Sequence, residues 1–168
     1  IKGIWCVPKY SNPTGHTYSD ATVRRFAKLG KVAGADFRIM WDNAYTVHHL
    51  SDTHDQLLNI TTACAEAGTE DSVITLASTS KVTFAGAGVA FLGASANNLG
   101  AFESFLVPQV IGFDKVNQLR HARLLKDSND IAKHMAAHRV ILEPKFQRVQ
   151  EKLMPLAEAD LATWSQPG

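Results

Sequence analysis

Three short segments of the chain carry side chains that could do chemistry: residues 10–15 (YSNPTG), 41–45 (WDNAY) and 78–81 (STSK). Each follows an apolar run with strand character. Ligands of open α/β sheets bind just beyond the carboxyl ends of the strands, so we expect the three segments to share one site. Together they supply an amide, a carboxylate, phenols, hydroxyls and an amine.

Lys81 has the most distinctive chemistry of this set. A lysine amine that is partly removed from water loses its proton readily and can act as a nucleophile. Small hydroxyl residues precede Lys81 and an apolar run follows it, which is compatible with partial burial. On this segment alone, the alternative is a surface lysine in a loop. For Asp42, similarly, the alternative is a helix cap or a turn residue.

The glycines that follow Lys81 do not make a nucleotide-binding loop. A dinucleotide-binding loop has the pattern Gly-x-Gly-x-x-Gly. Gly86 and Gly88 match its first two glycines, but Phe91 stands at the position of the third. A P-loop needs its lysine after the glycines and before Ser or Thr, whereas Lys81 precedes them and is followed by Val82. A reactive amine and an ordinary strand with small-residue packing remain as interpretations.

The apolar pattern predicts an α/β fold. Strands are expected at residues 3–7, 37–41, 73–77 and 88–93. Helices are expected from residue 19 or 20 to residue 30 or 34, and from residue 52 or 53 to residue 68. This alternation favours a parallel sheet.

The chain after residue 97 is mostly helical in pattern. Helices are expected at residues 99–107 and 113–125, and a long one from residue 131. Pro144 and Pro155 are expected to kink or break the long helix.

The composition argues against several classes of protein. A net charge of +1 does not suggest a nucleic-acid partner, and the apolar runs are shorter than a membrane span. Cys6 and Cys64 are interpreted as small buried hydrophobes, which favours a reducing cytoplasm over a disulfide or a zinc site. The first residues lie in a strand-like run without an initiator methionine, so we expect a piece of a longer protein.

The three polar segments together resemble a known family. Asn-Pro-Thr-Gly at residues 12–15, Asp42-x-x-Tyr45 and Ser78-x-x-Lys81 occur in the order found in fold-type I pyridoxal-phosphate aminotransferases. The sequence of these motifs looks closest to the MocR-like aspartate aminotransferase subgroup, and so do two later segments, GFDKVNQLRHARLLKD (112–127) and WSQPG (164–168). The resemblance covers essentially the whole chain.

The resemblance implies an architecture and an activity. Residues 1–125 would be the central part of a large α/β domain with a mostly parallel sheet, and residues 126–168 a helical connection toward a small domain. The activity implied is transfer of an amino group from aspartate to 2-oxoglutarate, by a cytoplasmic homodimer. A non-catalytic sensor domain of a MocR-type regulator and a lyase or decarboxylase are the alternatives. The 168-residue piece by itself is expected to bind cofactor weakly and not to transaminate.

The resemblance also implies roles for single residues. Lys81 would form the internal aldimine with pyridoxal 5′-phosphate and shuttle a proton. Asp42 would pair with the pyridine nitrogen, and Tyr45 and Asn12 would hydrogen-bond the 3′ oxygen. Ser78 would donate to the phosphate.

Further roles are implied less directly. Ser80 is a second phosphate ligand, Asn12 also a substrate ligand, and Pro13 is expected after a cis peptide bond. Many family members carry an arginine eight residues after the lysine; here that residue is Val89, so phosphate binding must depend on Ser78, backbone N–H groups or residues outside this chain. Arg120 is either a substrate-carboxylate ligand across a dimer interface or a solvated arginine.

The histidines are interpreted as packed or exposed side chains. His48 and His49 are adjacent, and His134 and His138 have the four-residue spacing of one helix face. That spacing can hold a metal, but a third ligand is not evident in the sequence. We therefore predict no metal site.

Overall fold

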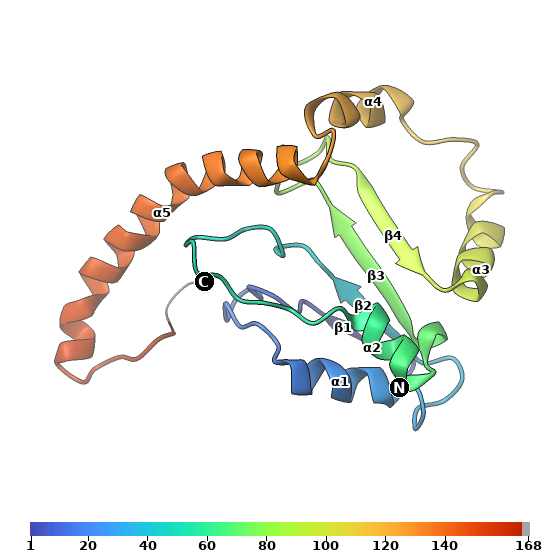
Figure 1. Cartoon of the computed structure of the whole chain (residues 1–168), viewed down its shortest axis with the longest axis horizontal. Coiled ribbons are helices and arrows are strands. Elements are labelled where there is room, and N and C mark those ends of the chain that lie inside the picture. Colours follow the sequence, from blue (N-terminus) through green and yellow to red (C-terminus); the bar gives the residue numbers. More distant parts are fainter. Residues whose placement is uncertain (166–168) are drawn as a thin grey trace.

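The computed structural model describes residues 1–165, which form a mixed four-stranded sheet with helices around it (Figure 1). The strands are β1 (Gly3–Cys6), β2 (Arg38–Asp42), β3 (Val73–Ser78) and β4 (Ala90–Ala94), in that order across the sheet. The first three are parallel, which confirms the α/β class.

The fourth strand differs from the parallel sheet that the alternation favours. β4 runs antiparallel to β3, with Leu76 opposite Leu92. A parallel crossover needs about a dozen residues or more, usually a helix, and residues 79–89 between the two strands contain only turns. The short connection therefore reverses the chain direction.

Helices α1 (Asp20–Leu29) and α2 (Ile60–Ala67) cover one face of the sheet (Figure 1). Ser19 caps α1 by accepting a hydrogen bond from the N–H of Thr22. The prediction that the second helix begins at residue 52 or 53 is wrong, because Asn59 is the cap of α2 and residues 43–59 are a loop. This loop joins the end of β2 to the helix.

The core lies between this face and the two helices. It consists of buried apolar side chains from both layers: Cys6, Val23, Ala27, Phe37, Ile39, Trp41, Ile60, Ala63, Cys64 and Val73. Both cysteines are buried and unbridged, as the sequence predicts. Burial raises the pKa of each thiol, which keeps it protonated and unreactive.

Three further helices follow the sheet: α3 (Ala96–Leu106), α4 (Lys115–Leu124) and α5 (Ser128–Glu158). Of the kink or break expected at Pro144 and Pro155, a break does not occur, because α5 continues through both prolines as one bent helix (Figure 1). Both proline side chains are exposed, so the carbonyls that lose a helical partner can bind water instead.

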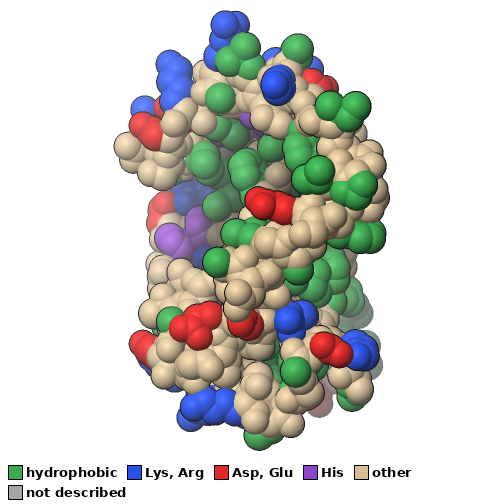
Figure 2. All heavy atoms as spheres, turned by 90° about the vertical axis from the view of Figure 1, so that its right-hand side faces the viewer, with side chains coloured by type: hydrophobic (Ala, Val, Ile, Leu, Met, Phe, Trp, Pro, Cys, Tyr) green, Lys and Arg blue, Asp and Glu red, His purple; other side chains and the backbone are tan. Residues whose placement is uncertain are grey.

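Many apolar side chains of this later part are exposed. Figure 2 shows them gathered on the side of β4 and α3, and they include Phe91, Phe102, Phe105 and Phe113. Within residues 1–165, none of the helices combines the length and the apolar character that a membrane crossing needs. The proposed division into residues 1–125 and 126–168 stays a prediction, and residues 166–168, with the end of WSQPG, lie outside the described residues.

Candidate functional site

The ends of β2 and β3 bring two of the predicted segments together. Asp42 pairs with Leu76 in the sheet register, and the N–H of Asn43 donates to Leu76 O at 2.8 Å. Ser78 ends β3 two residues later. Because β1, β2 and β3 are parallel, the segments that follow them leave the sheet at one edge.

Lys81 and Tyr45 meet at this edge. Lys81 Nζ lies 4.8 Å from the centre of the Tyr45 ring, in a cation–π geometry. Lys81 belongs to the turn after β3, and Tyr45 to the loop after β2. The two side chains therefore lie together at this edge, while their role in a binding site stays a prediction.

Asp42 has a partner that the sequence did not indicate. The indole N–H of Trp5, on β1, donates to Asp42 Oδ2 at 3.3 Å. Both residues lie on the sheet face opposite α1 and α2, since side chains alternate along a strand and the neighbouring Cys6 and Trp41 are buried in the core. The bond leaves Oδ1 of the carboxylate for another partner.

Asn12 lies in a tight turn after β1, with its side chain exposed. The Asn12–Pro13 peptide bond is cis, as the resemblance implies. The N–H of Gly15 donates to Ser11 O, and Gly15 has a left-handed φ of 69°, which favours glycine. The bond between Gly15 and Ser11 closes the turn that carries the Asn12 side chain.

The turn after β3 is built around the buried Thr79. Its N–H donates to Val89 O at 2.9 Å, and its hydroxyl accepts from the N–H of Val89 at 2.8 Å. A Cβ on Gly88 would lie 2.8 Å from the backbone N of Ser80, so only glycine fits there. Residues 88–89 therefore serve the turn, and the side chain at position 89 brings no cation to a phosphate.

Arg120 contacts the loop that follows Lys81. Its guanidinium, on α4, lies 5.6 Å from the centre of the Phe84 ring. A role toward a substrate carboxylate stays a prediction for this arginine.

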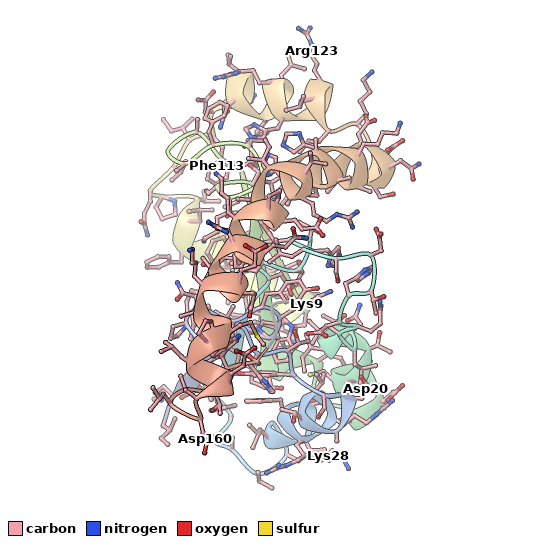
Figure 3. The ribbon with its side chains drawn as sticks, turned by 90° about the vertical axis from the view of Figure 1, so that its left-hand side faces the viewer. Lys9, Asp20, Lys28, Phe113, Arg123 and Asp160 are labelled. Carbon is pink, nitrogen blue, oxygen red and sulfur yellow. The ribbon has the colours of Figure 1, made fainter. Side chains whose placement is uncertain are left out.

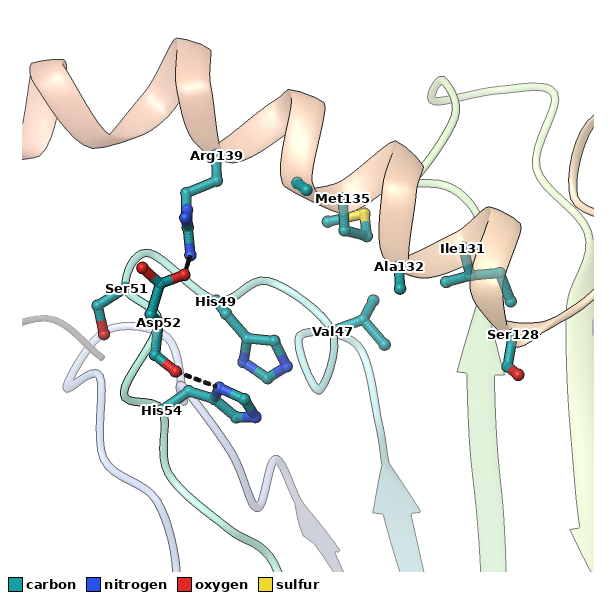
Figure 4. A pocket seen from close by; sticks show the side chains of 11 residues that line it. Val47, His49, Ser51, Asp52, His54, Ser128, Ile131, Ala132, Met135 and Arg139 are labelled. Atoms are coloured by element: carbon teal, nitrogen blue, oxygen red, sulfur yellow. Dashed lines mark hydrogen bonds and ion pairs between the residues drawn. The ribbon is translucent and has the colours of Figure 1, made fainter.

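α5 passes across the edge at which the parallel strands end, as Figure 3 shows from the side of this helix. A hollow lies between α5 and the loop after β2, and Arg139 reaches across it to pair with Asp52 at 2.6 Å (Figure 4). Burial, and then the charge of Lys9, lowers the pKa of His49 in this hollow to about 4, so its ring is neutral near pH 7. His49 Nδ1 bonds to the Tyr10 hydroxyl at 2.9 Å, which connects the loops after β1 and β2.

The sequence reasoning did not find the bonds that Trp5 and the histidines make. Among the described residues, groups of three or more side chains suited to a metal are absent. His48 and His134 instead contact backbone carbonyls of the turn that carries Lys81. The four-residue spacing of His134 and His138 correctly indicated one helix face, but it contains no information about the partner.

The groups at the edge fit pyridoxal phosphate by their chemistry. An amine can bind the cofactor's aldehyde, and a carboxylate can pair with its ring nitrogen. A phenol and an amide can hydrogen-bond its ring oxygen, and hydroxyls can hydrogen-bond its phosphate. This set is supplied by the last residues of β2 and β3 and by the segments that follow β1, β2 and β3: Lys81, Asp42, Tyr45, Asn12 and Ser78.

Comparison with known proteins agrees with this chemistry. The family model for aspartate aminotransferase matches residues 1–168. The chain belongs to this family. An aspartate aminotransferase of Corynebacterium glutamicum is 40% identical over 168 residues, which are 99% of the chain and 39% of that protein. A protein of Mycolicibacterium smegmatis that carries the name aminotransferase is 48% identical with the same coverage.

Solved aminotransferases share the fold. A structure from Corynebacterium diphtheriae matches with a TM-score of 0.91 and 40% identity over 99% of the chain and 41% of its own length. An α-aminoadipate aminotransferase from Thermus thermophilus, complexed with a phosphopyridoxyl-leucine, matches with a TM-score of 0.72 and 23% identity over 90% of the chain and 37% of its own length. The fold is thus that of the fold-type I enzymes, and the chain spans about two fifths of its relatives' length.

Proposed function

We propose that the protein containing this chain is a pyridoxal-phosphate-dependent aminotransferase that moves the amino group of aspartate, or of a related amino acid, to 2-oxoglutarate. The observation that carries the proposal is the Lys81 amine, 4.8 Å from the centre of the Tyr45 ring at the edge where Asp42 ends β2. When bound, the cofactor supplies an aldehyde for covalent attachment and an electron sink.

The chain's own residues have distinct roles in this proposal. Lys81 Nζ binds the cofactor covalently and, when released, holds and moves the proton of the substrate Cα. The Asp42 carboxylate holds the proton on the ring nitrogen, because a nearby negative charge favours the protonated form. The Tyr45 hydroxyl and the Asn12 amide bond to the ring oxygen, and Asn12 also orients the substrate.

Ser78 and Ser80 are the proposed phosphate ligands. Ser78 ends β3, and Ser80 begins the turn that carries Lys81. Since Val89 provides no charge, we infer that part of the phosphate site comes from residues outside this chain.

The finer assignments rest on the sequence motifs and on the C. glutamicum relative. We assign the chain to the MocR-like subgroup, and we take aspartate as amino donor because that relative is an aspartate aminotransferase. We further propose a homodimer in the cytoplasm, where two unbridged thiols persist.

The decisive experiment uses the whole protein with pyridoxal phosphate. Borohydride is expected to fix the cofactor to the peptide that contains Lys81, as mass spectrometry would show. Lys81→Ala is expected to abolish the adduct, whereas Lys9→Met, which alters a lysine near the neighbouring loop, is expected to retain it on Lys81. A protein-bound adduct in Lys81→Ala would refute the proposal.

Addition of aspartate then separates the reactions. Formation of oxaloacetate and the amine form of the cofactor identifies a transaminase. Binding of aspartate without turnover would identify a sensor domain, and release of carbon dioxide or of ammonia would identify a decarboxylase or a lyase.

A further inference from the structure

Three consecutive residues that begin with Lys81 each bond to a histidine. His48 Nε2 lies 3.2 Å from Lys81 O, and His134 Nε2 lies 2.7 Å from Val82 O. His121 Nε2 lies 3.0 Å from Thr83 Oγ1. The histidines come from the loop after β2, from α5 and from α4. Three elements that are distant in sequence therefore meet at one turn.

The direction of two of these bonds follows from chemistry. A carbonyl oxygen can only accept, so His48 and His134 both carry a proton on Nε2. His48 Nδ1 is buried, and it has no hydrogen-bond partner within residues 1–165. The donors to the carbonyls of Lys81 and Val82 are thus the Nε2–H groups of His48 and His134.

The other side of the turn is fixed by Thr79. Its carbonyl accepts the N–H groups of Val82 and Thr83 at 2.9 and 2.8 Å. Val82 is buried, whereas the Lys81 side chain is exposed. The backbone is therefore held from both sides while the amine stays accessible.

His48 contacts both members of the Lys81–Tyr45 pair. Its ring packs edge-on against Tyr45, with centroids 5.9 Å apart at an interplanar angle of 70°. The same ring bonds to the Lys81 carbonyl. A displacement of His48 would therefore alter the position of Lys81 relative to Tyr45.

We propose that His48, His134 and His121 are positioning residues that hold the turn at Lys81 so that its amine stays over the Tyr45 ring. This inference rests on the proposed function, in which Lys81 binds the cofactor. Misplacement by about 1 Å can cost two orders of magnitude in rate. The bond to the Lys81 carbonyl, two bonds from the Lys81 Cα, and the bonds to the next two residues therefore affect its chemistry without contact to the reacting atoms.

The test compares leucine and glutamine at the same positions in the whole protein. Leucine removes the donor, whereas glutamine places an N–H near the former Nε2. His48→Leu and His134→Leu are each expected to slow covalent loading of Lys81 about tenfold, the effect of about 1.4 kcal/mol, and the glutamine variants are expected to restore most of the rate. His54→Leu is the control, because His54 lies on the same loop as His48 but bonds to Asp52 O.

A second readout needs no cofactor. Amide hydrogen exchange of Val82 and Thr83 in the apoprotein is expected to accelerate about tenfold in the leucine variants, because loss of the carbonyl bonds loosens the turn, while exchange of β2 amides stays unchanged. Leucine variants that load and exchange at the wild-type rate would overturn the inference, as would glutamine variants as slow as leucine. If a leucine variant fails to fold, the loading and exchange rates of the glutamine variant at the same position test the inference.

The experiment distinguishes failure of the proposed function from failure of this inference. If the proposed function fails, wild-type protein does not form an adduct on Lys81, and the amide exchange alone decides whether the histidines hold the turn.

Discussion

The sheet with α1 and α2, and the helices α3, α4 and α5, are stabilised in different ways. The first region has a continuous core that includes Ile39 and Trp41, each nearly without exposed surface. Among the described residues of the second region, Met135 alone is a buried apolar side chain, while others such as Ile141 and Phe146 are exposed. Polar bonds such as those of His134 and Arg139 connect α5 to the site. The first region thus determines where the strand edge lies, and the second adds side chains to it.

A matched pair of substitutions tests this difference most strongly. Ile39→Ala is expected to lower the free energy of unfolding by about 2–5 kcal/mol, because it opens a cavity in the core. Ile141→Ala on α5 is expected to change it by less than about 0.5 kcal/mol, since 61% of that side chain is exposed. Urea unfolding of the 168-residue chain measures both, and equal effects would contradict the comparison.

The pH dependence of the free energy of unfolding provides the next test, because it includes the titration of His49. Burial first, and then the charge of Lys9, lowers the pKa of His49 from 6.5 to about 4 in the folded chain. Between these values the unfolded chain binds more protons, so stability rises with pH across this window and is lost as the pH falls toward 4. Urea midpoints at pH 7 and pH 5 are expected to differ less in His49→Phe than in the wild type. An unchanged difference would show that other groups govern the acid response.

Helix caps in the two regions give a smaller contrast. Asn59→Ala is expected to lower the free energy of unfolding by about 1 kcal/mol, because the Asn59 side chain accepts the N–H groups of Thr61 and Thr62 in α2. Asp127→Ala removes the equivalent cap of α5 and is expected to speed amide exchange in its first turn with little effect on global unfolding. A global loss from Asp127→Ala as large as that from Asn59→Ala would show that α5 unfolds with the core.

The smallest effect is expected at the pair of Arg139 and Asp52. The Asp52 side chain is almost fully exposed, so Asp52→Asn is expected to cost less than about 1 kcal/mol. That cost should vanish near 1 M salt, where screening acts over about 3 Å. A salt-independent loss would indicate that the pair is buried in solution.

The sequence predicted the fold class, the strand positions and the edge at which Lys81 and Tyr45 meet, because apolar runs and turn residues are local signals. It did not predict the start of α2, since Asp52, Thr53 and Asn59 are all good caps and burial of Ile60 decides between them. The bonds of Trp5 and His134 were missed for another reason. Their partners lie 37 and 52 residues away, and such contacts leave no local pattern.

The bonds that attach α5 to the strand edge are unevenly distributed along this helix. His134 and Arg139 bond the first half of α5 to the strand edge, whereas most side chains after Pro144 are exposed. Through His134, the turn that carries Lys81 is therefore bonded to the first half of this helix.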